Sequence, residues 1–73
     1  MVSAKKLLEK MERLPPDMPL AQVEKVLEYL GWKYDRTSGS HDVYVRNGQH
    51  ISVPTVGGRD VKRTYLKQIV DNK

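Results

Sequence analysis

The dipeptide Asn47-Gly48 constrains the fold of this chain more than any other feature of the sequence. Asn-Gly between two short alternating segments is the strongest two-residue signal for a β-hairpin, because a type I′ turn needs positive φ at both central residues. We therefore predict strands at 41–46 and 49–53, joined by this turn. Pro54 then ends the sheet, because proline cannot donate to a strand ladder.

A two-residue turn also sets which side chains share a face of the hairpin. Val45 lies opposite His50, and Tyr44 lies opposite Ile51. The predicted core face carries Tyr44, Ile51 and Val53. The predicted open face carries His41, Val43, Val45 and His50.

An earlier strand is predicted at 32–37, followed by the turn residues 37–40. Regular alternation places Trp32, Tyr34 and Arg36 on one face. Lys33, Asp35 and Thr37 fall on the other. Core packing is the expected role of Trp32 in so small a domain, and Tyr34 is a candidate for stacking on a base if it is exposed.

Helical periodicity is clear on both sides of this region. Residues 3–14 form an amphipathic helix that Ser3 can cap and that Pro15-Pro16 ends. We expect its apolar stripe to pack on its own domain. A stiff connector follows, and Asp17 or Met18 opens a second helix with Pro19 in its first turn. Gly31 is placed to end this helix in the left-handed conformation.

The last helix is predicted after a loop at Val56-Gly57-Gly58, with Asp60 as its cap. Its apolar positions are Val61, Tyr65, Leu66, Ile69 and Val70. Such a glycine-rich loop is either a phosphate site at a helix N-terminus or a plain connection. The element order predicts an α+β fold in which helices cover one face of a three-stranded antiparallel sheet.

Length and composition limit the chemistry. A chain of 73 residues forms one domain at most and buries only about 60% of its unfolded surface. It has no cysteine and two histidines, so we expect neither disulfides nor a metal or other cofactor. The longest apolar runs fall well short of the ~20 residues of a membrane span. We expect a cytoplasmic protein without a membrane anchor.

The net charge of +4 is unevenly distributed. Residues 1–31 contain five basic and five acidic side chains, whereas residues 32–73 contain eight basic and four acidic ones. This excess of positive charge in residues 32–73 favours a polyanionic partner. The candidate RNA-binding residues are Arg36, Ser40, Arg46, Arg59, Lys62, Arg63 and Lys67.

His41 is the candidate for chemistry. Histidine is the ordinary side chain that both takes and gives a proton near neutrality, and here it follows a Gly39-Ser40 turn. A lone histidine in a strand is more often structural or on the surface. His50 starts about 14 Å away, counted along and across the strands, so it is an unsuitable partner for His41 on one phosphate and is a surface residue or a contact for RNA or antitoxin.

The ordered motifs of residues 19–70 resemble the HicA family, the toxin half of a bacterial toxin–antitoxin pair. The resemblance rests on Gly31-Trp32, Gly39-Ser40-His41 with Tyr44, Asn47-Gly48, Val53-Pro54, Gly57-Gly58 and the helix 62–70. It divides the chain into an additional helix and connector at 1–18 and a HicA-like domain at 19–73. It implies an α-β-β-β-α fold similar to the double-stranded-RNA-binding domain.

The resemblance also implies a function. HicA toxins are mRNA interferases, and their essential histidine corresponds to His41. HicB antitoxins bind and mask these toxins, so a toxin–antitoxin oligomer is one expected assembly. This predicts a type II toxin that cleaves single-stranded mRNA without metal, with His41 as general acid or base. The alternatives are a non-catalytic RNA-binding module using the same basic surface, and an interaction protein assembled through its first helix.

Overall fold

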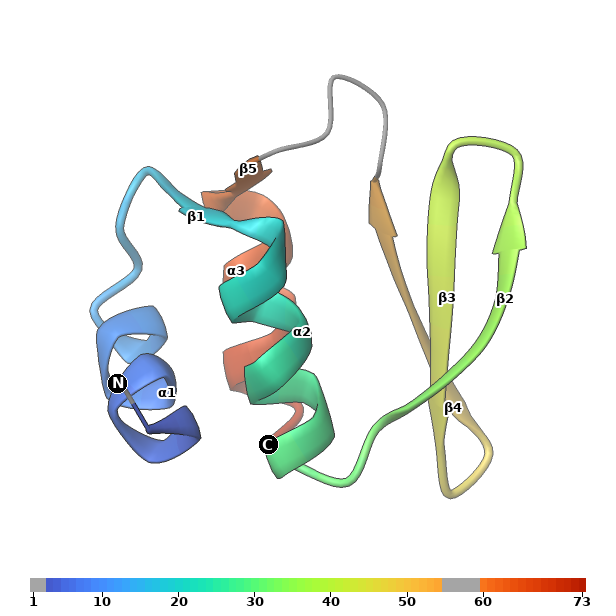
Figure 1. The fold of residues 1–73 in the computed structure, drawn as a ribbon, viewed down its shortest axis with the longest axis horizontal. Coiled ribbons are helices and arrows are strands. Elements are labelled where there is room, and N and C mark those ends of the chain that lie inside the picture. Colours follow the sequence, from blue (N-terminus) through green and yellow to red (C-terminus); the bar gives the residue numbers. More distant parts are fainter. Residues whose placement is uncertain (1–2, 55–59) are drawn as a thin grey trace.

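The computed structural model describes residues 3–54 and 60–73 of the chain. These residues form helices, a three-stranded sheet and a small two-stranded sheet (Figure 1). The elements are α1 (Ala4–Glu12), β1 (Asp17–Pro19), α2 (Leu20–Tyr29), β2 (Lys33–Ser38), β3 (His41–Arg46), β4 (Gln49–Pro54), β5 (Asp60–Lys62) and α3 (Arg63–Asp71). Within this described part, no helix is long and apolar enough to cross a membrane.

The β3–β4 hairpin confirms the register predicted from Asn47-Gly48. Both turn residues have positive φ, 49° and 82°, as a type I′ turn requires. Tyr44 pairs with Ile51 and Val45 pairs with His50. The residues predicted to face the core are buried: Tyr44, Ile51 and Val53. The sheet order is β2-β3-β4, so β3 is its central strand.

The second helix ends as predicted but begins later. Gly31 has φ of +91°. The amide of Gly31 donates to the Glu28 carbonyl and the amide of Trp32 donates to the Leu27 carbonyl, the two hydrogen bonds of a Schellman motif. Neither Asp17 nor Met18 opens the helix: Pro19 is its N-cap, and the two residues before it lie in β1.

The pairing of β1 with β5 is the main feature that the sequence did not predict. Met18 pairs with Val61 and both side chains are buried, so this short ladder is fixed by the core below it. Asp60 lies in β5, and the prediction that it caps the last helix was wrong. The first amide of α3, that of Arg63, donates to the Pro16 carbonyl at 3.0 Å instead.

The helices cover one face of the three-stranded sheet. In Figure 1, α2 and α3 stand between α1 and the sheet. The apolar stripe of α1 packs into the same core through Leu7 and Met11, which confirms the expected packing of this helix on its own domain. Ser3 caps α1 by accepting from the Lys6 amide. The core that contains Leu7 and Met11 of α1 also includes Met18, Val23, Val26, Leu27, Trp32, Leu66 and Ile69.

The result is the predicted α+β fold. The order α2-β2-β3-β4-α3 is the α-β-β-β-α arrangement of the double-stranded-RNA-binding domain. To this arrangement the chain adds α1 and β1 in front and the short strand β5 just before α3. Because the helices pack on one face, the other face of the sheet is left open. The open face carries the residues considered next.

Candidate functional site

His41 lies directly after a tight turn, on the open face of the sheet. Gly39 and Ser40 form the two-residue connection between β2 and β3, and Gly39 has φ of +59°. Glycine at the first position of such a turn avoids the strain that a Cβ causes at positive φ. His41 is the first residue of β3, is half-buried, and pairs with Ser38 on one side and Pro54 on the other.

A depression of about 370 Å³ surrounds His41 on the open face. Side chains from all three strands line it: Arg36, Ser38, His41, Val43, His50 and Ser52. This confirms that His41, Val43 and His50 share a face, as the hairpin register predicted. Ser38 and Ser52 were not among the predicted site residues. The predicted pairs Val45–His50 and Tyr44–Ile51 imply that Ser52 lies opposite Val43, as the structure has it, so the signal for Ser52 was present in the sequence.

A β-bulge brings Arg36 to this depression. The β2–β3 register shifts between Tyr34, which pairs with Tyr44, and Arg36, which pairs with Val43. Asp35 is the additional residue, so the alternation of β2 reverses after it. The prediction that Arg36 shares a face with Trp32 and Tyr34 was therefore wrong. The shift places a guanidinium on the same face as His41.

Arg36 keeps donors available for a ligand. Its Nη1 donates to the carboxylate of Asp35, the neighbouring residue. A guanidinium carries five N–H donors in a planar fork, so this single pair leaves most of them unused. Both side chains are exposed. Of the predicted RNA-binding cations that the structure describes, Arg36 is the one that lines the depression.

Arg46 has structural contacts instead. Its Nη1 donates to the carbonyls of Leu30 at 3.1 Å and Lys73 at 3.3 Å, and its Nη2 donates to the carbonyl of Asn72. Its guanidinium carbon lies 4.4 Å from the centre of the Trp32 ring, a cation–π contact. Arg46 thereby satisfies carbonyls at the C-terminal ends of α2 and α3 and covers the buried Trp32.

The other predicted cations lie around β5 and α3, on the helix-covered side of the sheet. Lys62 is within 4.0 Å of Asp17, and Lys67 bonds to Asp71 at 2.8 Å. Exposed pairs of this kind contribute about 0–1 kcal/mol, so they leave both lysines accessible.

Three other residues were predicted to bind RNA: Arg63, Arg59 and Ser40. Arg63 donates from Nε to the Pro15 carbonyl at 3.4 Å, which ties α3 to the connector. Arg59 and the loop at Val56-Gly57-Gly58 lie outside the described residues. Ser40 is half-buried in the turn before His41 and is not among the residues that line the depression.

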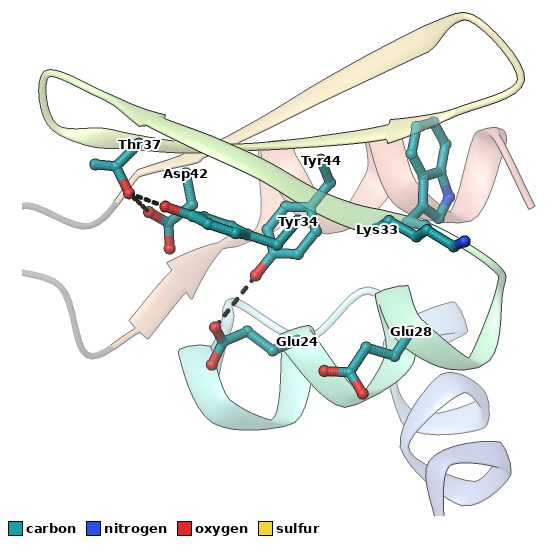
Figure 2. Close-up of a pocket in the computed structure, with 8 residues that line it drawn as sticks. Glu24, Glu28, Lys33, Tyr34, Thr37, Asp42 and Tyr44 are labelled. Atoms are coloured by element: carbon teal, nitrogen blue, oxygen red, sulfur yellow. Dashed lines mark hydrogen bonds between the residues drawn. The ribbon is translucent and has the colours of Figure 1, made fainter.

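A second hollow lies on the helix side of the sheet. This cleft has a volume of about 540 Å³. In Figure 2, Glu24 and Glu28 of α2 face Tyr34, Thr37, Asp42 and Tyr44 of the sheet. Trp32 and Lys33 complete its lining. This cleft was not predicted from the sequence, because it depends on how α2 crosses the sheet. Its carboxylates make it a poor site for a phosphate.

One hydrogen bond joins the two walls of the cleft, and a second links neighbouring strands within the sheet wall. The Tyr44 hydroxyl donates to Glu24 at 3.2 Å, and the Thr37 hydroxyl donates to Asp42 at 2.8 Å (Figure 2). Burial, and after it the charge of Glu24, raise the pKa of Tyr44 far above the usual tyrosine value. Tyr44 is therefore a neutral hydrogen-bond donor and is unsuited to act as a base.

Metal ligands do not converge in the described part of the chain. Within residues 3–54 and 60–73, no three His, Asp or Glu side chains gather in an arrangement that could hold a metal ion. The depression offers instead two imidazoles, a guanidinium and two hydroxyls around the apolar side chain of Val43. That set donates hydrogen bonds and suits an anionic ligand with an apolar or aromatic part.

Comparison with known proteins connects this geometry to a family. Residues 21–72 match the family described as the HicA toxin of bacterial toxin–antitoxin systems. The match runs from the start of α2 to the end of α3, so it contains the depression and the cleft. A search of curated proteins and a search of solved structures each found no match.

Proposed function

The chain belongs to the HicA toxin family and is thus the toxin of a bacterial toxin–antitoxin pair, and from this premise we propose that it is a metal-independent mRNA endoribonuclease of a type II system. The observation that supports the proposal is the placement of His41. A half-buried imidazole lies in an anion-suited depression with Arg36 beside it. The depression binds single-stranded mRNA, and His41 moves the proton that cleavage requires.

The reaction is an intramolecular transfer at phosphorus. The ribose 2′-oxygen attacks the adjacent phosphorus, a P–O bond forms there, and the bond to the 5′-oxygen of the next nucleotide breaks. His41 removes the proton from the 2′-hydroxyl or supplies a proton to the departing 5′-oxygen. A positioned acid or base contributes about 10²–10⁴-fold to such a rate.

Arg36 supports this step electrostatically. Arg36 lines the depression, where its guanidinium binds the anionic ligand and stabilises the negative charge that grows on the phosphoryl oxygens. Lys62, Arg63 and Lys67 form a second basic face, away from the depression, that adds to the attraction for RNA. Arg46 is assigned a structural role because its guanidinium is held by three carbonyls.

The antitoxin acts on the same face. A basic ribonuclease is harmful in a cytoplasm that contains mRNA, where we place this protein, so its activity requires control. We propose that a HicB-like antitoxin covers the open face and closes access to His41. Co-expression with the protein encoded beside the toxin, followed by pull-down and a cleavage assay, tests this. A complex that still cuts RNA contradicts masking.

The test of the catalytic role is His41→Ala. We expect the variant to fold, to bind RNA with an affinity close to wild type, and to lose both toxicity and RNA cleavage. Wild-type cleavage persists in the presence of a chelator. The retained binding has a physical reason, because Arg36 and the α3 cations hold phosphates independently of the imidazole.

Three results contradict the proposal. A His41→Ala variant as toxic as wild type excludes the general acid or base role. Equal loss of cleavage and binding identifies His41 as a contact of a non-catalytic RNA-binding module. A wild type that cuts only after metal is added excludes the metal-independent reaction.

A further inference from the structure

His50 lines the same depression as His41 but lies near its other end. It is exposed on β4 and pairs with Val45, whereas His41 pairs with Pro54 at the far end of that strand. Four residues along a strand and one strand across separate the two positions by about 14 Å at the backbone. At that separation the two imidazoles do not act on one phosphodiester. A ligand long enough to fill the depression still reaches both.

The lining around His50 is suited to an anion. Ser52 lies two residues away on the same strand and face, and both side chains are exposed. None of the six residues that line the depression carries a carboxylate, whereas the cleft on the other face has three. Imidazole and hydroxyl groups donate hydrogen bonds to phosphate oxygens. The same end of the depression has no aromatic side chain besides the imidazole on which a base could stack.

We propose that His50, together with Ser52, binds a second backbone phosphate of the RNA strand whose cleaved phosphodiester lies at His41. The inference rests on the proposed function for the identity of the ligand as single-stranded RNA. In this arrangement the RNA strand runs along the depression from the β2–β3 turn toward the β3–β4 turn. His50 is a binding residue in this arrangement and takes no part in the proton transfer.

The experiment measures binding and chemistry separately. Affinity for a fluorescent single-stranded oligoribonucleotide is measured over a range of salt in the His41→Ala background, where the RNA stays intact. Single-turnover cleavage at saturating RNA is measured in the otherwise wild-type protein. The variants are His50→Ala, His50→Gln and His50→Lys. Gln49→Ala is the matched control, because Gln49 is the exposed neighbour of His50 on the opposite face of β4.

We expect His50→Ala to weaken binding about three- to tenfold, the effect of losing one solvent-exposed hydrogen bond of ordinary strength. His50→Lys, which keeps a cation, restores the affinity and steepens the dependence of log affinity on log salt by up to ~0.7 relative to His50→Ala. His50→Gln lies between them. Gln49→Ala binds like its parent, and all these variants cleave saturating RNA at the wild-type rate.

Unchanged affinity in both His50→Ala and His50→Lys overturns the inference, as does an equal loss in Gln49→Ala. A slower cleavage rate at saturating RNA assigns His50 to the chemistry and also overturns it. Loss of antitoxin binding without loss of RNA binding identifies a protein contact instead. If wild type cuts RNA while the His50 variants bind normally, only this inference fails. If wild type binds no RNA at all, the proposed function fails with it.

Discussion

The depression around His41 and the cleft around Tyr44 lie on opposite faces of the same strands and differ in charge. Imidazole, guanidinium and hydroxyl groups line the depression, whereas three carboxylates and three aromatic rings line the cleft. Adjacent residues contribute to opposite sides: Ser38 and His41 to the depression, Thr37 and Asp42 to the cleft. Strand alternation, reversed once in β2 by the bulge at Asp35, separates the two chemistries. A net charge of +4 therefore predicts a polyanionic partner but not the face that it contacts.

The two faces also differ in what they contribute to stability, and two valines test this difference. Val53 is 0% exposed within the core, whereas Val43 is 5% exposed and lies on the open face. Val53→Ala should lower the free energy of unfolding by about 2–4 kcal/mol, because it removes buried area and leaves a closed cavity. Val43→Ala should lower the free energy of unfolding by roughly half as much, since water can fill the surface indentation that the smaller side chain leaves.

Urea unfolding of both variants measures this pair. Equal losses at the two positions would show that the open face is as much a part of the core as the helix side.

Introducing a negative charge on one face or the other tests the contrast between the two hollows directly. Ser52→Glu places a carboxylate in the depression, and Gln49→Glu makes the same charge change on the other face of β4. At ~5 Å from a phosphate, repulsion by the new charge reduces the binding free energy by about 1–3 kcal/mol, for an effective dielectric constant between 80 and 20. Ser52→Glu should therefore weaken RNA binding roughly ten- to a hundredfold.

Gln49→Glu should change the affinity by less than about threefold, because only the long-range part of the charge acts there. Fluorescence anisotropy at two salt concentrations checks both variants. Similar losses in the two proteins would mean that RNA responds to net charge and not to the depression.

The hydroxyl of Tyr44 provides a smaller test on the cleft side. Tyr44→Phe removes the hydrogen bond to Glu24 and should lower the free energy of unfolding by about 1 kcal/mol, with RNA affinity and cleavage unchanged. Tyr34→Phe is the matched control, because Tyr34 is 55% exposed and its hydroxyl is hydrogen-bonded to the exposed side chain of Thr37. A loss of cleavage in Tyr44→Phe would place the cleft in the reaction.

The smallest effect is a pH dependence. Burial and the charge of Glu24 raise the pKa of Tyr44 above the ~10 of an unfolded tyrosine. The unfolded chain thus loses this proton first. The contribution of Tyr44 to stability is complete below pH ~10 and declines as the pH rises toward the folded-state pKa. Between pH 8 and 10.5, wild type should lose more stability than Tyr44→Phe, and parallel curves would contradict the assignment.

Local signals in the sequence were sufficient for much of this architecture. Asn47-Gly48 and Gly31 need positive φ, so they fixed the hairpin register and the end of α2. The register in turn placed His41 on the open face. Each of these predictions depends on a backbone requirement of a few neighbouring residues, which a sequence displays directly.

Features that depend on distant contacts were not predictable in the same way. The pairing of Asp17–Pro19 with Asp60–Lys62 joins short segments more than forty positions apart, and one of them contains a proline. Its stability comes from the burial of Met18 and Val61 in the assembled core. The cleft likewise requires Glu24 to meet Tyr44 across two elements.

The bulge at Asp35 is the most consequential of these features for the site. No glycine or proline marks it, yet it decides the face on which Arg36 lies. Arg46 is a related case, because a basic residue near a hairpin turn resembles an RNA contact until the carbonyls of α2 and α3 are placed around it.

We propose that RNA lies on the open face at His41, and an amide chemical-shift titration of the His41→Ala protein with a single-stranded oligoribonucleotide tests this placement. We predict the largest changes at Ser38, Val43 and Ser52, which surround the depression, and small ones at Glu24 and Glu28 across the sheet. Changes centred on α2 and the cleft, with the open face unaffected, would show that RNA binds the other side of the sheet.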